Sequence, residues 1–197
     1  MTRIDRRGLL TGAAATAALA GCATRVTPAR SPAPSDEPGL LSDMVVLKRI
    51  ARDTYALGAG DPTLPGAQRS AASRFAAIEN QHLGELSRQL TNMGHGQPPV
   101  PAPLPGRGAA RLHRLLDLEL ATAAAWVWMV PRAVSKELRA ITTLLMPVEE
   151  RQAATLSALV GRPLPDEAAV GALGPATVRA RFAPPGPAAA PGSVGPR

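Results

Sequence analysis

The stretch FAAIENQHLGEL, residues 75–86, decides the fold, because it reads as one amphipathic helix with two polar residues on its apolar side. At 100° per residue, the apolar side lies within about 60° of Phe75 and holds three more hydrophobic residues, Leu86, Leu90 and Met93. Glu79 and His82 fall within the same arc. Because a buried carboxylate is costly unless it is paired, protonated or bound to metal, the helix predicts a polar site inside the fold.

Two further segments repeat this pattern around Glu119 and Glu149. The apolar residues that lie within about 40° of Glu119 are Leu112, Leu115, Ala123, Trp126 and Val130. Those that share the face of Glu149 are Leu138, Leu145, Leu156 and Val160. Gln152 lies at the edge of the Glu149 face. Three inward carboxylates near one level of a fold repel one another unless a cation or shared protons lie between them.

Four segments of the chain have helical periodicity, and none has the alternation of a strand. We expect helices over about residues 41–57, 66–93, 108–130 and 133–160. Asp36 or Ser42 could cap the first helix, Gly94 suits the position after the second, and Pro147 should kink the fourth. Four amphipathic helices predict an all-α four-helix bundle.

The connection between the second and third helices is the Pro-rich run HGQPPVPAPLPGR, residues 95–107. An extended Pro-rich chain advances about 3.1 Å per residue, so some 12 residues cover roughly 37 Å. That is close to the length of a 25-residue helix at about 1.5 Å per residue. The run therefore predicts a crossover from one end of the bundle to the other, with a loose surface loop between antiparallel neighbours as the alternative.

Residues 1–21 predict an export signal. A basic start is followed by an apolar run over residues 8–20, which is shorter than the roughly 20 residues that span a bilayer and fits a secretory signal. Leu-Ala-Gly-Cys at residues 19–22 resembles the lipobox of bacterial lipoproteins, which implies acylation of Cys22. The pair Arg6-Arg7 resembles a twin-arginine export signal. The alternative is a chance arginine pair in a signal handled by the general secretory route.

Lipidation of Cys22 implies a protein held at the extracytoplasmic face of the cell membrane. Each buried lipid CH₂ contributes about 0.8 kcal/mol, so two or three acyl chains give stable anchoring. Cys22 is the only cysteine, so an intramolecular disulfide cannot form.

The predicted domain plan is a tether over residues 22–39, the bundle over 40–162 and a largely disordered Pro/Ala/Gly-rich tail over 163–197.

The formal net charge of +7 does not indicate a nucleic-acid partner. Clusters of basic and aromatic residues are absent from the sequence, and an exported basic protein is expected only to be weakly attracted to anionic lipid or wall polymer. The expected partner is the membrane, through the lipid. Protein partners are not indicated, and a homodimer is left open.

Inward Glu residues together with Glu-x-x-His are how bundle cores bind iron or manganese, because adjacent turns then offer oxygen and nitrogen ligands. The candidate metal ligands are Glu79, His82, Glu119 and Glu149, with Gln152 beside them rather than bound. The alternative is a buried hydrogen-bonded polar group that binds no ion.

Residues 40–162 resemble the ferritin-like superfamily, and more narrowly an actinobacterial ferritin-like family of unknown function found on exported proteins. The residues and short motifs on which this resemblance rests are Glu79-Asn-Gln-His82, Glu119, Glu149-Glu-Arg-Gln152, Asp53-Thr-Tyr55-Ala-Leu-Gly58 and Met93-Gly94. Metal-binding members imply a Glu in the first helix and a His at position 152. Here Ile50 lies near the expected Glu and Gln152 replaces the His, which argues against a full symmetric di-iron centre.

Three functions are consistent with these features. The first is a non-enzymatic envelope protein in which the Glu/His group is a polar core network. The second is an iron- or manganese-binding protein, or a weak oxidase, that uses the residual site. The third is a membrane-surface adaptor that acts through its basic charge. The sequence has no nucleophile–base set, phosphate loop or dinucleotide fingerprint, which favours the first function.

Overall fold

The structure, a computed structural model of the 197-residue chain, describes residues 36–165 and 173–183. The predicted export signal with Arg6 and Arg7, and the predicted lipid site Cys22, lie outside the described residues. Within them, the secondary structure consists of α1 (Glu37–Ala59), α2 (Gly66–Asn92), α3 (Gly108–Met129), a 3-10 turn η1 (Val130–Arg132), α4 (Lys136–Val160) and α5 (Pro175–Phe182). The prediction of an all-α protein is confirmed, since the described residues contain no strand.

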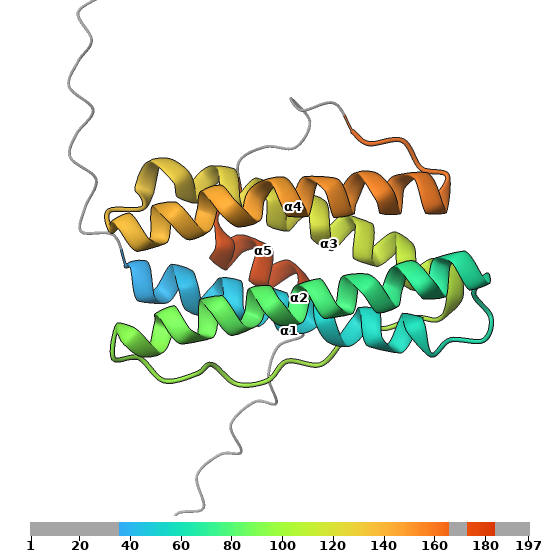
Figure 1. Cartoon of the computed structure of the whole chain (residues 1–197), viewed down its shortest axis with the longest axis horizontal. Helices are drawn as coiled ribbons and strands as arrows, with labels where there is room; N and C mark the ends of the chain where they lie inside the picture. The colour runs from blue at the N-terminus through green and yellow to red at the C-terminus, as the bar shows by residue number, and fades with distance from the viewer. Residues whose placement is uncertain (1–35, 166–172, 184–197) are drawn as a thin grey trace, which may run out of the picture. The chain divides into compact units, whose positions relative to one another are not determined.

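The four long helices lie roughly side by side, with α1 packed along α2 and α3 packed along α4 (Figure 1). Short connections make each of these pairs antiparallel. The core between them is hydrophobic and holds Trp126, Leu47, Leu86 and Leu115 with no exposed surface. Each helix therefore buries one apolar face, as its sequence period requires.

The helix ends follow local capping rules. The Asp36 side chain accepts a hydrogen bond from the Gly39 N–H at 3.0 Å, so Asp36 caps α1 as predicted. Gly94, which follows the C-cap residue Met93 of α2, has φ of 79°, the left-handed conformation that glycine adopts without strain. At the start of α4, the Glu37 carboxylate accepts from the Ser135 N–H at 2.9 Å, which ties the beginnings of α1 and α4 together.

The fourth helix begins later than predicted, because η1 and the Ser135 cap occupy the residues before Lys136. It then continues through Pro147 to Val160. A rotation at Pro147 that would bring Glu149 to the surface is not seen, since Glu149 has no exposed surface.

The Pro-rich run 95–107 leaves α2 at one end of the molecule and returns lengthwise to the start of α3 at the other (Figure 1). Its course is fixed by hydrogen bonds to α1. The Leu104 N–H donates to Thr54 Oγ1 at 2.8 Å, and the Arg49 guanidinium donates to the Pro98 carbonyl. At the end of the run, the Gly108 N–H donates to Asp61 Oδ2 at 2.8 Å.

Helix α5 is an ordered element within residues 163–197, the tail that the sequence predicts to be largely disordered. Pro175 starts this helix, Val178 is completely buried, and Arg179 Nη1 lies 2.7 Å from Asp43 Oδ1. The helix packs against α1 and α3. The Pro/Ala/Gly-rich composition of the tail gave no sign of this helix, which is held against the core by buried Pro175 and Val178, by partly buried Phe182 and by the ion pair.

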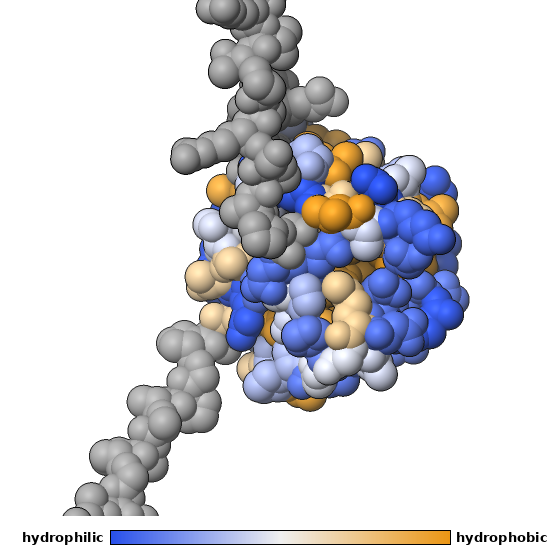
Figure 2. Space-filling model, turned by 90° about the vertical axis from the view of Figure 1, so that its left-hand side faces the viewer, coloured by the Kyte–Doolittle hydropathy of each residue, from blue (hydrophilic) through white to orange (hydrophobic). Residues whose placement is uncertain are grey.

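Seen from the end where α1 begins, the surface is mainly hydrophilic, with hydrophobic groups in small separate clusters (Figure 2). Scattered exposed hydrophobic residues of this kind are normal for a protein surface. None of the helices in the described ranges is both long enough and apolar enough to cross a membrane.

Candidate functional site

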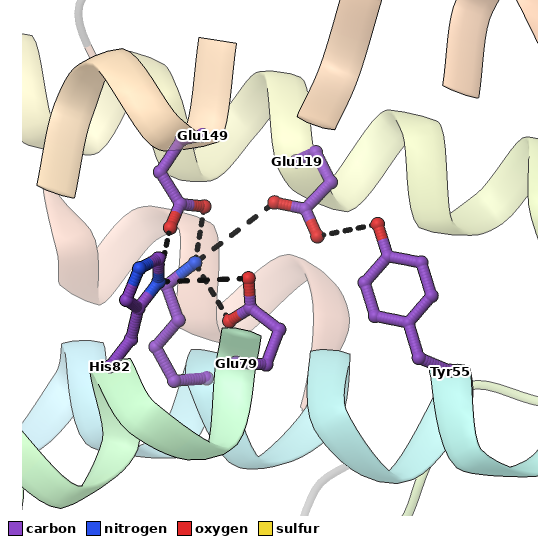
Figure 3. A network of polar contacts seen from close by, with 6 residues as sticks. Tyr55, Glu79, His82, Glu119 and Glu149 are labelled. Carbon is purple, nitrogen blue, oxygen red and sulfur yellow. Dashed lines mark hydrogen bonds and ion pairs between the residues drawn. The ribbon is translucent and has the colours of Figure 1, made fainter. Parts of the chain in front are cut away.

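The four long helices direct polar side chains toward one point in the core (Figure 3). The residues that meet there are Lys48 and Tyr55 from α1, Glu79 and His82 from α2, Glu119 from α3 and Glu149 from α4. All six are buried, and His82 retains the most exposure at 7%. The structure thus brings together all four of the predicted metal ligands, and it adds Lys48 and Tyr55, which were not predicted.

Lys48 lies at the centre of this group. Its Nζ atom is 3.0 Å from Glu79 Oε2 and 4.0 Å from Glu119 Oε2, and it donates a hydrogen bond to Glu149 Oε2 (Figure 3). The ammonium therefore contacts a carboxylate from each of the other three long helices. A cation does lie among the carboxylates, as their mutual repulsion requires, and it belongs to the protein itself.

A signal for Lys48 was present in the sequence. Leu41, Lys48 and Tyr55 are seven residues apart, a spacing that returns a helix to within about 20° of the same direction. Leu41 and Tyr55 are both fully buried, so the residue midway between them faces the core. Lys48 was missed because lysine is almost never buried without a partner, and its partners lie on other helices.

This placement corrects the expectation for the first helix. The residue of α1 that meets Glu79 is Lys48, and Ile50 is part of the hydrophobic core. The antiparallel pairing of α1 with α2 places Lys48 at the level of Glu79. Leu57, near the end of α1, is 47% exposed.

Glu149 is held between two neighbours. Its Oε2 accepts from Lys48, and its Oε1 lies 3.0 Å from Nδ1 of His82. Burial acts to raise the pKa of Glu149, but the charge of Lys48 and the contact with His82 outweigh burial and lower that pKa to about 2. Glu149 is therefore the carboxylate that stays ionised beside the ammonium.

Glu79 and Glu119 differ from Glu149. Burial, followed by repulsion from Glu149, raises the pKa of Glu79 despite its contact with Lys48. Burial and repulsion from Glu79 raise the pKa of Glu119 well above its usual value. Burial therefore disfavours the charged forms of Glu79 and Glu119, whereas Lys48 and His82 favour the charged form of Glu149.

Tyr55 completes the network on the side of Glu119. Its hydroxyl donates to Glu119 Oε1 at 2.8 Å, and its ring packs edge-on against Phe75 with the ring centroids 5.4 Å apart. Burial and the neighbouring Glu119 raise the pKa of the phenol well above its ordinary value. Tyr55 therefore acts as a hydrogen-bond donor that keeps its proton.

The pKa of Lys48 reflects two opposed effects. Burial lowers it, because an ammonium is poorly solvated in a core, whereas attraction to Glu149, Glu79 and Glu119 raises it. Attraction prevails, and the pKa of Lys48 lies above its ordinary value. The lysine is thus a permanent cation in the physiological range.

The same residues also have the spacing of a metal site. Glu79, His82 and Glu149 each offer one ligand atom, and these atoms lie within 4.8 Å of one another. Carboxylate oxygen and imidazole nitrogen suit manganese, iron or zinc. The cluster could hold a metal on geometry alone, but Lys48 Nζ already contacts oxygens of both Glu79 and Glu149. A metal ion needs ligands at about 2 Å, so the residues do not fit a resident metal while the Lys48 ammonium stays between them.

Gln152 is buried one turn beyond Glu149, and neither its side-chain oxygen nor its nitrogen has a hydrogen-bond partner among the described residues. Trp126 Nε1 is also buried without such a partner. No hydrogen bond joins Gln152 to the four predicted ligands among the described residues, so its place beside a metal stays a prediction.

Comparison of the chain with protein-family models, with curated proteins and with solved structures found no match.

Proposed function

We propose that this chain is an exported, lipid-anchored, ferritin-like protein that is not an enzyme, in which a buried lysine replaces the metal of a carboxylate centre. The observation that carries the proposal is the position of Lys48 Nζ, 3.0 Å from Glu79 and hydrogen-bonded to Glu149. A single ammonium supplies one positive charge at the point where a metal would supply two or more. It offers neither an open coordination position nor a change of oxidation state.

The ferritin-like part of the proposal is supported by the helix order. Two antiparallel pairs, α1–α2 and α3–α4, are joined by the run 95–107, which extends along α1 from one end of the helices to the other. One long crossover between two helix pairs is the connection of ferritin-like bundles. The inward Glu79, Glu119 and Glu149, one on each of three helices, are the second support.

The membrane part of the proposal rests on the sequence. The lipobox-like residues 19–22 lead to acylation of Cys22, and the chain from Cys22 to the start of α1 at Glu37 acts as a tether on the extracytoplasmic face. The membrane is the proposed partner, reached through the lipid. A nucleic-acid partner is not part of the proposal.

The test is the metal content of the purified protein. The full chain carrying Cys22→Ser is produced in medium supplemented with iron and manganese, and bound metal is measured by elemental analysis beside a matched Glu79→Ala variant. We expect far less than one ion per chain in both proteins. Near-stoichiometric iron or manganese that disappears in Glu79→Ala would overturn the proposal.

The second candidate is a metal-binding protein or weak oxidase, favoured by the spacing of Glu79, His82 and Glu149. In that case Lys48 would have to leave the carboxylates when the ion binds. The two candidates predict opposite results in the elemental analysis, and they also differ in stability. Added iron or manganese should raise the melting temperature only if the metal binds the folded state.

A further inference from the structure

We propose that Lys48 is the single feature that keeps divalent cations out of the core, and that its removal opens a site for one ion of the manganese–iron–cobalt–zinc class. This inference deepens the proposed function and rests on it in one respect, namely that the unaltered protein does not bind such ions. The site consists of Glu79, His82 and Glu149, with Glu119 as a fourth donor.

The atoms that would bind the ion already lie close together in the folded protein. Ligand atoms of Glu79, His82 and Glu149 lie within 4.8 Å of one another, and Glu119 Oε2 lies 4.0 Å from the Lys48 nitrogen. The ammonium marks a position that faces oxygens from three helices. An ion at this position would be able to reach each of them with small side-chain movements.

The donor atoms also have electron pairs to offer. Both oxygens of Glu79, Oε2 of Glu119, Oε1 of Glu149 and Nδ1 of His82 are buried and form no hydrogen bond outside this cluster among the described residues. His82 strengthens the case for a cation site, because its buried Nδ1 has no hydrogen-bond partner outside the cluster and points at the carboxylates, 3.0 Å from Glu149 and 3.8 Å from Glu79.

Truncating Lys48 removes both obstacles to an ion. Lys48→Ala deletes the side chain beyond Cβ, which frees space, and it removes the positive charge that repels an incoming cation. The carboxylates then lack a counter-charge in a buried site, and a bound cation relieves that cost. Lys48→Met separates the two effects, because it removes the charge but fills nearly the same volume.

The experiment measures Co²⁺ binding to the full chain carrying Cys22→Ser, with Lys48 intact or replaced by Ala or Met. Visible absorption of bound Co²⁺ reports coordination by nitrogen and oxygen, and elemental analysis after gel filtration reports stoichiometry. We expect one Co²⁺ per Lys48→Ala chain, bound at least about 100-fold more tightly than by the chain with Lys48. Lys48→Met should bind much more weakly than Lys48→Ala.

A matched pair of second substitutions locates the ion. In the Lys48→Ala background, Glu79→Ala should abolish Co²⁺ binding. Glu150→Ala should leave it unchanged, since Glu150 is exposed on the same helix turn as Glu149. Equal losses from both substitutions would contradict a site in the core.

The outcomes separate the two proposals. Tight Co²⁺ binding by the chain with Lys48 intact would overturn the proposed function. No binding by that chain and none by a folded Lys48→Ala chain would overturn only the present inference. If Lys48→Ala folds only when Co²⁺ is added, as seen by circular dichroism, the inference is supported.

A variant that does not fold even with Co²⁺ is followed by Lys48→Gln. The amide of Gln can donate to the carboxylates, and its carbonyl oxygen can serve as a ligand. Failure of Lys48→Gln to bind Co²⁺, or to fold in its presence, would overturn the inference.

Discussion

The Nζ atom of Lys48 lies 3.0 Å from Oε2 of Glu79, and the two side chains are 1% and 0% exposed. An ion pair buried to this degree is expensive to desolvate, and it survives only where further polar contacts surround both partners. Here Glu149 and Glu119 supply those contacts from two other helices. Lys48 therefore determines whether the inward carboxylates stabilise the core or destabilise it.

Replacing Lys48 by Met should destabilise the protein by about 3–5 kcal/mol, because it leaves buried carboxylates without their counter-charge. The measurement is the free energy of unfolding from urea titration. Since carboxyl groups without the ammonium must hold protons to stay buried, the loss should be larger at pH 8 than at pH 5. Lys136→Met is the control, because the Lys136 side chain is 86% exposed. Similar losses for both variants would contradict a central role for Lys48.

Glu149 should make the protein sensitive to acid. Its pKa is lowered to about 2 from an ordinary 4.5, so its stabilising effect is present above about pH 4.5 and is lost as the pH falls toward 2. The difference in unfolding free energy between the wild type and Glu149→Gln should therefore shrink by up to about 3 kcal/mol between pH 5 and pH 2. A difference that stays constant would show that Glu149 is not held ionised. The exposed neighbour Glu150→Gln provides the control.

Tyr55→Phe should cost about 1–3 kcal/mol, because it leaves the buried Glu119 Oε1 without its donor. A double-mutant cycle with Glu119→Gln tests whether the loss belongs to this pair, and we expect the two losses to be less than additive.

Tyr55 is the only tyrosine, so ultraviolet absorbance follows its ionisation alone. Because the pKa of the phenol is raised, the signal of tyrosinate should appear only when the protein unfolds in alkali. Ionisation of the folded protein near pH 10 would contradict the burial of this group.

Cys22→Ser should release the protein from membranes in the native host, because it removes the acylation site. The measurement is the distribution of the protein between membrane and soluble fractions, together with the mass of the N-terminal peptide.

Arg6→Lys combined with Arg7→Lys should block export if the twin-arginine route is used. Export that is unaffected by this change would assign the signal to the general secretory route.

Most of the fold was predictable because each long helix carries a complete local signal. The period of apolar residues around Glu79, Glu119 and Glu149 identified the inward faces, and Asp36 and Gly94 marked helix ends. The exception is α5, whose few contacts depend on a surface formed by α1 and α3. A helix that is stabilised by its neighbours leaves little trace in its own sequence.

The three carboxylates and the histidine of the site were predictable from the sequence, and Lys48 was not. Glu79, His82, Glu119 and Glu149 stand out because charged residues interrupt apolar faces. Lys48 interrupts one too, but the long side chain of a lysine usually carries its charged end to solvent. Only the meeting of four helices shows that its nitrogen lies among carboxylates.

The most direct test is the nuclear magnetic resonance signal of the Lys48 side chain. The chain has only two lysines, so labelling lysine with ¹⁵N gives two Nζ signals, and exposed Lys136 exchanges its protons rapidly with water. We predict that Lys48 remains an ammonium with slowly exchanging protons at about pH 11, above the ordinary lysine pKa of about 10.4. Its signal should not change when equimolar Zn²⁺ is added. A neutral Lys48 amine at pH 8, or loss of the ammonium signal on addition of Zn²⁺, would contradict the account.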